Sequence, residues 1–280
     1  MKIALTGATG FIGRHLYNTL ADTPHDLVVL CRNSVPKNAL EANSRTKIVK
    51  WDLSDNNGDI FERTGAPDMV IHLAWGTLGN FQSPAHMTEE LPSHFSFLGG
   101  LIKSGLRRLM VAGTCFEYGL KNGEIDEDTP CQPATWYGLA KYSLLRQLEF
   151  LQREHHFELL WPRLFYLYGD GQPRNAIYPS LLRAIADGDR EFPMSAGEQL
   201  RDYLPVEEVA RLLAALVVSR SAGIVNVCSG QPISMRKLVE NWIAQKQSSI
   251  QPRLGHYPYR DFEPFAFWGA SQRLQKYLGQ

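Results

Sequence analysis

A tyrosine and a lysine four residues apart, Tyr137 and Lys141, could together move a proton. Positions i and i+4 of a helix lie on one face, so the two side chains would be neighbours. A free phenol has a pKa near 10, and a neighbouring ammonium lowers that pKa because it favours the phenolate. The pair could therefore exchange a proton with a carbonyl or alcohol oxygen, although this spacing also occurs in ordinary helix-surface pairs.

A hydroxyl that could hold the same substrate oxygen follows an apolar run. Thr114 lies in Ala112-Gly113-Thr114-Cys115, directly after the expected strand Arg108–Ala112. Ligands bind beyond the carboxyl ends of parallel strands, so this hydroxyl is well placed to orient a substrate. We expect Thr114, Tyr137 and Lys141 to be the catalytic residues.

A glycine-rich loop near the N-terminus predicts a bound dinucleotide. Its spacing is GxxGxxG, between an expected strand and an expected helix. The first glycine can make the tight turn, the second lets a pyrophosphate approach the backbone, and the third lets the helix pack closely on the sheet. The free N–H groups at the start of the helix would bind phosphate. The expected cofactor contacts in this loop are Gly7, Thr9, Gly10, Phe11, Ile12 and Gly13.

The end of the second expected strand bears on the choice between NAD and NADP. An acidic residue there would bind the ribose 2′-hydroxyl, but the sequence has Leu30-Cys31-Arg32-Asn33. Arg32 suits a 2′-phosphate, so we expect NADPH, with NADH also accepted; the alternative is an exposed loop arginine. Asp52 and Leu53, after the third strand, are expected to meet the adenine, and an Asp helix cap is the equal alternative.

The alternation of apolar runs and helical patterns predicts an α/β fold. Helices are expected at Phe11–Ala21, Glu89–Ser104 and Ala134–His155. Strands are expected at Lys2–Thr6, Asp26–Cys31, Thr46–Lys50, Asp68–Leu73, Arg108–Ala112 and Phe157–Leu164. This rhythm is typical of a parallel sheet covered on both faces with right-handed crossovers, which is the doubly wound Rossmann arrangement.

A smaller C-terminal lobe is expected after Leu164. The pattern there predicts helices at Asn175–Asp187, Val206–Ser219, Ser234–Gln245 and Ser271–Leu278, and a short strand at Ile224–Cys228. We expect residues 1–165 to form the dinucleotide-binding domain and residues 206–230 to return to it. Residues 166–205 and 231–280 would then form a substrate lobe, partly interleaved with the sheet domain.

Composition excludes several classes of protein. The 280 residues are 44% hydrophobic and 21% charged, which is typical of a globular chain and excludes disorder. The formal net charge is +0, so neither nucleic acid nor an anionic membrane is an expected partner. The start is a poor signal peptide, and no apolar run approaches about 18 residues. Four cysteines without a CxxC pair indicate reduced thiols and a cytoplasmic location, and the pair His155-His156 lacks the partners of a metal site.

Taken together, the motifs resemble the extended short-chain dehydrogenase/reductase family, in its nucleotide-sugar epimerase/dehydratase branch. The resemblance covers nearly the whole chain. Its pieces, in order, are the glycine loop, Val70-Ile71-His72-Leu73-Ala74, Gly113-Thr114 with Glu117-Tyr118-Gly119, Tyr137 with Lys141, Arg163-Leu164-Phe165 with Tyr168-Gly169, Arg201-Asp202-Tyr203 with Val206 and Val209-Ala210, and Arg260-Asp261-Phe262-Glu263-Pro264.

The resemblance implies roles for the expected catalytic residues. Tyr137 would be the general acid/base, Lys141 would lower its pKa and bond the nicotinamide ribose, and Thr114 would orient the substrate oxygen. Leu73 and Ala74 would line the cofactor. A homodimer through the helices Glu89–Ser104 and Ala134–His155 is also implied.

The resemblance also implies a nucleotide-sugar substrate and residues that contact it. Arg201 and Arg260 resemble two arginines that clamp the pyrophosphate, a role suited to the planar guanidinium fork; a salt bridge within the lobe is the alternative for each. Tyr166 stands where the family usually has Asn, and Asn175 is a further expected substrate contact. Trp75, Phe81 and Trp136 could wall the sugar pocket or belong to an ordinary core.

Departures from the family pattern narrow the reaction. Dehydratases of this branch place Asp and Glu after the catalytic Thr, and this chain has Cys115 and Phe116, which cannot do that acid/base work. The remaining chemistry is hydride transfer at one carbinol carbon. We expect a reductase that uses NAD(P)H to reduce C4 of a nucleoside-diphosphate 4-keto-6-deoxyhexose, and the resemblance to enzymes making dTDP-6-deoxytalose or dTDP-fucose implies a dTDP-linked sugar. The alternative is a nucleotide-sugar 4-epimerase with tightly bound NAD.

Overall fold

A parallel sheet forms the centre of the molecule, whose computed structural model describes residues 1–32, 44–53 and 59–279. Neighbouring strands follow the order β13, β8, β5, β4, β1, β2 and β3, with β6 beside β8, and every pair is parallel. Their bounds are β1 Lys2–Thr6, β2 Asp26–Cys31, β3 Thr46–Lys50, β4 Met69–His72, β5 Arg108–Val111, β6 Gly113–Thr114, β8 Glu158–Leu164 and β13 Gly223–Val227. Since the chain builds outward from β1 in one direction and then from β4 in the other, the sheet is doubly wound, which confirms the predicted fold class.

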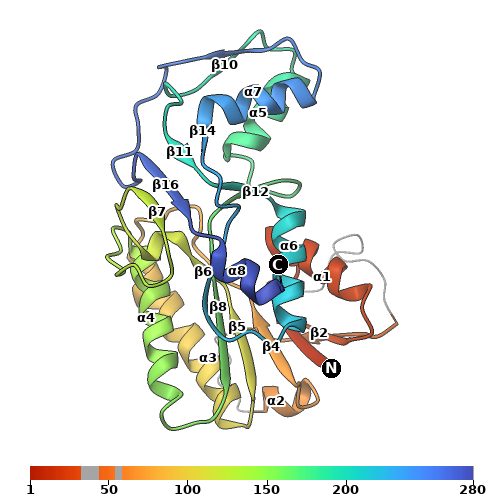
Figure 1. Ribbon diagram of the computed structural model, residues 1–280. Helices are drawn as coiled ribbons and strands as arrows, with labels where there is room; N and C mark the ends of the chain where they lie inside the picture. The colour runs from red at the N-terminus through yellow and green to blue at the C-terminus, as the bar shows by residue number, and fades with distance from the viewer. Residues whose placement is uncertain (33–43, 54–58, 280) are drawn as a thin grey trace.

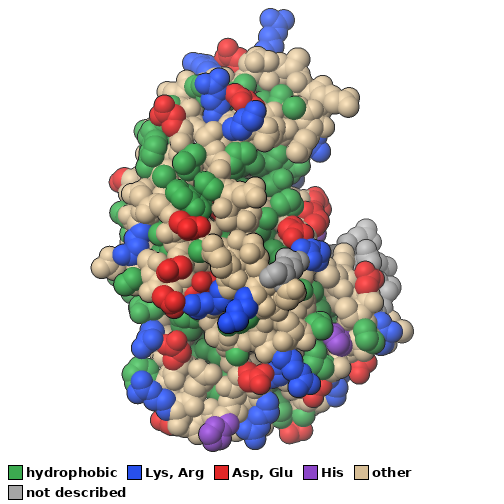
Figure 2. All heavy atoms as spheres, in the orientation of Figure 1, with side chains coloured by type: hydrophobic (Ala, Val, Ile, Leu, Met, Phe, Trp, Pro, Cys, Tyr) green, Lys and Arg blue, Asp and Glu red, His purple; other side chains and the backbone are tan. Residues whose placement is uncertain are grey.

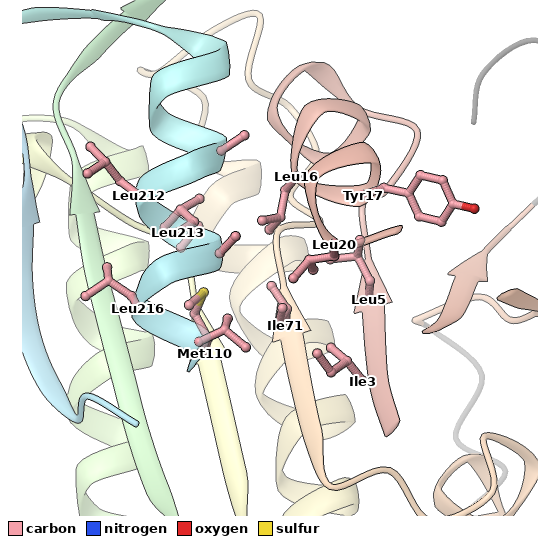
Figure 3. Close-up of a cluster of buried hydrophobic side chains, with 14 of the residues drawn as sticks. Ile3, Leu5, Leu16, Tyr17, Leu20, Ile71, Met110, Leu212, Leu213 and Leu216 are labelled. Carbon is pink, nitrogen blue, oxygen red and sulfur yellow. The ribbon is translucent and has the colours of Figure 1, made fainter. Parts of the chain in front are cut away.

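Helices cover both faces of this sheet, as Figure 1 shows. Their bounds are α1 Phe11–Ala21, α2 Ile60–Arg63, α3 Leu91–Lys103, α4 Trp136–Leu151, α6 Val206–Val218 and α8 Gln272–Leu278. Alternation along β1 divides the core: Ile3 and Leu5 join the cluster under α1 and α6, whereas Ala4 joins the cluster under α3 and α4. Figure 3 shows the first cluster, in which Leu16 of α1 and Leu213 of α6 lie over the strands.

The helix expected at Glu89–Ser104 has a different start. A π-helical turn, η1, spans His86–Glu90 before α3 begins at Leu91. The Leu91 N–H donates to the His86 carbonyl, five residues back, and the next residue, Pro92, has no N–H to continue the regular ladder. The wider turn therefore precedes the proline, and it places side chains of η1 against the loop that follows β4.

The smaller lobe lies above the carboxyl edge of the large sheet in the view of Figure 1. It contains a four-stranded sheet in the order β14, β11, β16 and β7, and the pairs β9 with β12 and β10 with β15. The bounds are β7 Gly123–Ile125, β9 Tyr166–Tyr168, β10 Glu191–Pro193, β11 Leu200–Arg201, β12 Tyr203–Pro205, β14 Ile233–Ser234, β15 Gln251–Arg253, β16 Ala266–Gly269, α5 Ile177–Ala186 and α7 Met235–Gln245.

Two segments differ from the expected division of the chain. β7 belongs to residues 1–165 but pairs with β16, so this segment of the first part of the chain joins the sheet of the smaller lobe. α8 was expected in the substrate lobe, yet it packs on the sheet domain. Leu274 is buried in the cluster of α1 and α6, and the Tyr277 hydroxyl donates to the Ala222 carbonyl at 2.7 Å.

The surface carries charges of both signs. Lys and Arg are interspersed with Asp and Glu over the face shown in Figure 2. Within the described ranges, none of the helices has the length and apolar character needed to cross a membrane.

Candidate active site

Thr114 is fixed by a short 3₁₀ turn, η2, which spans Cys115–Glu117. The Thr114 hydroxyl accepts from the Phe116 N–H at 3.3 Å, and the Glu117 carboxylate accepts from the Thr114 N–H at 2.9 Å. These two bonds form a reciprocal cap of the turn. As expected from sequence, the Thr114 side chain lies at the carboxyl edge of the sheet, beside the strand β8.

Glu117 anchors this turn to the core. Its fully buried carboxylate accepts from Trp161 Nε1 at 3.0 Å and from Arg163 Nε at 2.8 Å, both on β8. A buried ion pair that lost one partner would leave an uncompensated charge, so the pair ties η2 firmly to the sheet. Sequence reasoning did not assign a role to Glu117, although its position three residues after Thr114 is the spacing of a capping box.

Tyr137 and Lys141 lie on the first turns of α4, as their spacing predicts. Thr135 caps this helix by accepting from the Gly138 N–H at 3.0 Å. The Tyr137 side chain is half-buried and forms a hydrogen bond with Thr114. Lys141 is 2% exposed, and its Nζ donates to the Ala112 carbonyl at 2.9 Å. The structure therefore brings the three expected catalytic side chains together at one sheet edge.

The electrostatics of this group differ from the expectation that Lys141 lowers the pKa of Tyr137. Burial raises the pKa of the Tyr137 phenol above its ordinary value, and the hydrogen bond with Thr114 opposes that rise only in part. Burial also lowers the pKa of Lys141 to about 7, against the charges of Glu117 and Glu90. Desolvation is the largest cause in both cases; it outweighs the neighbouring carboxylates at Lys141, and at Tyr137 the charge of Glu117 adds to it, so the phenol holds its proton firmly in the free protein.

Aromatic rings surround the Tyr137 phenol. Phe81 stacks against it with centroids 5.2 Å apart, and Trp75 and Phe116 each lie 6.2 Å away. The Tyr137 N–H also donates to the Phe81 carbonyl at 3.1 Å, which ties the loop after β4 to the start of α4. Trp136, the third aromatic residue considered as a pocket wall, is 42% exposed.

A small pocket opens next to Thr114. Its lining includes Cys115 and Phe116 from η2, and Phe262, Pro264 and Phe267 from the C-terminal segment. The remaining lining residues are Gly119, Ala134, Thr135 and Tyr166. The Thr135 hydroxyl is already bonded to the start of α4, so the side chains offer a mainly apolar wall.

The glycine loop has the shape that a dinucleotide pyrophosphate needs. Gly7 has φ +74°, and a Cβ there would lie 2.7 Å from the Ala74 nitrogen. A Cβ on Gly13 would lie 1.9 Å from the Gly7 carbonyl oxygen, so only glycine allows α1 to approach this closely. Gly10 is the exposed N-cap of α1 and leaves backbone N–H groups of the first turn open to an anion. The residues present therefore fit the cofactor.

The other expected cofactor contacts lie around this loop. Thr9 is exposed, and Phe11 and Ile12 are half-buried in the first turn of α1. Leu73 follows β4, and its N–H donates to the Thr6 carbonyl at 3.2 Å, which sets Leu73 and Ala74 beside Gly7.

Arg32 and Asp52 end neighbouring strands. The Trp51 N–H donates to the Cys31 carbonyl at 2.9 Å, so the residues that follow, Arg32 and Asp52, lie at adjacent ends of β2 and β3. Arg32 is exposed, whereas Asp52 and Leu53 are half-buried. Asn33 lies outside the described residues.

The two expected substrate arginines converge on one carboxylate. Arg201 on β11 lies 3.3 Å from Glu263, and Arg260 lies 3.0 Å from the other oxygen of the same carboxylate. Tyr166 donates to Glu263 at 3.4 Å. Both arginines thus form the salt bridge that was the alternative to a pyrophosphate clamp. Asn175 is exposed in the turn before α5 and does not join this group.

Comparison with known proteins places the chain in a family. The family model described as "NAD dependent epimerase/dehydratase family" matches residues 3–228. A dTDP-6-deoxy-L-talose 4-dehydrogenase (NAD(+)) from Aggregatibacter actinomycetemcomitans is 31% identical, over 96% of this chain and 100% of the relative. A UDP-glucose 4-epimerase from Corynebacterium glutamicum is 24% identical, over 100% of this chain and 90% of the relative.

A solved structure agrees with the fold. The UDP-N-acetylglucosamine 4-epimerase from Methanobrevibacter ruminantium superposes with a TM-score of 0.87 at 22% identity, covering 99% of this chain and 91% of that one. The family match spans most of the chain and includes the glycine loop, Thr114, Tyr137 and Lys141. The chain belongs to the NAD dependent epimerase/dehydratase family and is an NAD-dependent enzyme of the oxidoreductase type.

Proposed function

We propose that this protein reduces C4 of a nucleoside-diphosphate 4-keto-6-deoxyhexose with NAD(P)H, the sugar being dTDP-linked. The observation that carries the proposal is the group Thr114, Tyr137 and Lys141 at one sheet edge, beside a mainly apolar pocket. The dTDP-6-deoxy-L-talose 4-dehydrogenase among the relatives supports the same carbon and the same class of sugar.

The bound cofactor would supply the hydride that the carbonyl carbon accepts. The Thr114 hydroxyl orients the substrate oxygen, and Tyr137 gives its proton to that oxygen as negative charge develops on it. A phenol with a raised pKa holds its proton until the alkoxide forms, which suits the role of an acid. The glycine loop, Leu73 and Ala74 would hold the cofactor, with Lys141 at its nicotinamide ribose.

The pocket beside Thr114 favours a 6-deoxy sugar. Cys115 and Phe116 provide no group that could abstract a proton for dehydration: burial raises the pKa of the Cys115 thiol far above its ordinary value. The C6 methyl group is the apolar substituent closest to C4 on such a sugar, and it would enter the mainly apolar wall. A hydroxymethyl group would bury its hydroxyl against a wall whose polar side chains, Thr135 and Tyr166, already have partners, at a cost of about 1–3 kcal/mol.

The arginine pair supports a diphosphate substrate. Arg201 and Arg260 already hold one anion, the Glu263 carboxylate, and their guanidinium groups would take the pyrophosphate when the nucleotide sugar binds. Tyr166 would lie close to the pyrophosphate, because its hydroxyl bonds to Glu263, the carboxylate that both arginines contact. Asn175, exposed before α5, would contact the substrate only if that turn closes over it.

A panel of substrates tests this function. Purified protein with NADPH or NADH is given 4-keto-6-deoxyhexoses linked to dTDP, CDP, GDP and UDP, and the loss of the absorbance of the reduced nicotinamide is followed. We expect the fastest oxidation with the dTDP-linked sugar and almost none with the free 4-ketosugar, which lacks the pyrophosphate. Equal rates with free and nucleotide-linked sugars would contradict the proposal.

The UDP-glucose 4-epimerase among the relatives favours a second candidate, a 4-epimerase with tightly held NAD. The same three catalytic residues could oxidise C4 and reduce it again from the other side. An epimerase acts without net consumption of cofactor, so the two functions differ in stoichiometry.

Arg32 decides the cofactor preference in this proposal. Replacing Arg32 by Asp is expected to raise the KM for NADPH roughly 10- to 160-fold, because a charge-assisted hydrogen bond of about 1.5–3 kcal/mol to the 2′-phosphate is lost. The KM for NADH should stay similar or fall. Arg153→Asp, at an exposed site after α4, serves as the control for a change in net charge. An Arg32→Asp enzyme with unchanged selectivity would remove Arg32 from the cofactor site.

We also propose that the protein is a homodimer that pairs through α3 and α4. Phe150, near the end of α4, is 54% exposed and is an apolar side chain that such an interface would cover. Light scattering on the purified protein tests this, and a monomer mass would contradict it.

A further inference from the structure

A strained turn after β4 is held by a carboxylate from η1. Thr77 has φ +58°, a left-handed conformation that costs free energy for a residue with a branched side chain. Glu90 accepts from the Gly76 N–H at 3.0 Å and from the Thr77 hydroxyl at 3.1 Å, so it fixes both residues of the turn. A Cβ on Gly76 would lie 2.1 Å from the Glu90 oxygen, so the approach needs glycine.

The residue just before this turn, Trp75, is fixed from two further sides. Its indole stacks on His94 with centroids 4.4 Å apart and planes 8° from parallel. Its Nε1 donates to His86 Nδ1 at 3.1 Å. His86 lies in the π-helical turn, whose extra residue sets both His86 and Glu90 toward the loop.

A buried series of hydrogen bonds fixes His94, the histidine that stacks on Trp75. His94 lies 3.1 Å from Glu90 on one side and 2.7 Å from His72 on the other. His72 in turn lies 2.9 Å from the Thr6 hydroxyl at the end of β1. Every ring nitrogen of His72 and His94 has a partner in this series of hydrogen bonds. The His94 ring, which stacks on Trp75, is therefore held in one orientation.

The braced indole contacts the catalytic lysine. Lys141 Nζ lies 3.9 Å from the centroid of the Trp75 ring, within the distance of a cation–π interaction. The hydrogen bond to the Ala112 carbonyl satisfies one of the three donors of this buried ammonium. Carboxylates are more distant: Glu117 and Glu90 act on Lys141 through charge alone. The indole face of Trp75 is therefore the nearest favourable environment for the part of the Lys141 ammonium that the Ala112 carbonyl does not contact.

We propose that Trp75 is a positioning residue for Lys141: its indole face, fixed by His94, His86 and the turn that Glu90 holds, keeps the ammonium charged and in place for catalysis. The proposal rests on the proposed function, because it assigns Trp75 to the same catalytic group. If the proposal is right, the effect of replacing Trp75 on kcat and on stability depends on the charged ammonium of Lys141.

Two substitutions at Trp75 separate the aromatic face from simple packing. Trp75→Leu removes the π face and is expected to lower kcat about 2- to 30-fold, the range from an exposed to a desolvated cation–π interaction. Trp75→Phe keeps a ring and should recover most of this loss, with little change in the KM of the sugar. Tyr257→Leu, at an exposed aromatic residue in the loop after β15 and outside the proposed site and interface, is the matched control and should leave kcat unchanged.

A double-mutant cycle with Lys141→Met makes the test specific. Trp75→Leu should lower the urea midpoint of unfolding in the parent protein and much less in the Lys141→Met protein, because the charge it contacts is then absent. Equal shifts in the two backgrounds, or a Trp75→Phe enzyme as impaired as Trp75→Leu, would overturn the proposal. The unfolding cycle needs no substrate, so a failure of the proposed reaction would not be mistaken for a failure of this inference.

Discussion

Replacing Tyr137 by Phe lowers kcat about 10²- to 10⁴-fold in this account, because the acid that protonates the C4 oxygen is lost. The ring remains, so its stacking on Phe81 and the packing of α4 should persist. The measurement is steady-state reduction of the nucleotide 4-ketosugar, together with NADH fluorescence to show that cofactor affinity is retained.

Two comparisons sharpen this result. Thr114→Val should lower kcat less than Tyr137→Phe does, since the hydroxyl orients the substrate oxygen but does not give up its proton. Tyr142→Phe, on the same helix, removes a phenol outside the proposed site and serves as the matched control. A Tyr137→Phe enzyme with near-native turnover would contradict the catalytic assignment.

Glu117→Gln is expected to destabilise the fold by about 3–5 kcal/mol, because it leaves the Arg163 guanidinium buried without its counter-charge. Glu149→Gln is the matched control: it breaks the exposed Arg146–Glu149 pair on α4, where a change of about 0–1 kcal/mol is expected. Urea unfolding measures both. Similar small effects for the two substitutions would show that the buried pair does not secure η2.

The large sheet could be predicted because its strands are apolar runs and its helices have clear periodicity. Phe11–Ala21, Asp26–Cys31 and Thr46–Lys50 have the expected bounds. The smaller lobe was harder, because strands such as β11 and β14 have two residues each and show no alternation. Their partners lie far away in sequence, and tertiary contacts alone decide such pairings.

The members of the candidate site could also be named from sequence, but their electrostatics could not. The spacing predicted Tyr137 beside Lys141, the end of a strand predicted Thr114 at the sheet edge, and the structure brings the three together. The sign of the pKa shift of Tyr137 depends on burial by Phe81 and its neighbours, which no spacing shows.

Contacts between side chains that are distant in sequence could not be predicted either. Arg201 and Arg260 meet on Glu263, and the spacing of Arg260 and Glu263 at i and i+3 was the only signal of that pairing. The cation–π contact between Trp75, in the loop after β4, and Lys141, on α4, could be found only from the fold.

The stoichiometry of the reaction distinguishes a C4 reductase from a 4-epimerase. Purified protein is incubated with a dTDP-linked 4-keto-6-deoxyhexose and a limiting amount of NADPH or NADH, and in parallel with the corresponding 4-hydroxy sugar and no added cofactor. We expect one 4-hydroxy product for each reduced cofactor consumed, and no inversion at C4 in the parallel sample. Catalytic inversion at C4 without added cofactor, by protein that retains bound NAD, would contradict the reductase and identify an epimerase.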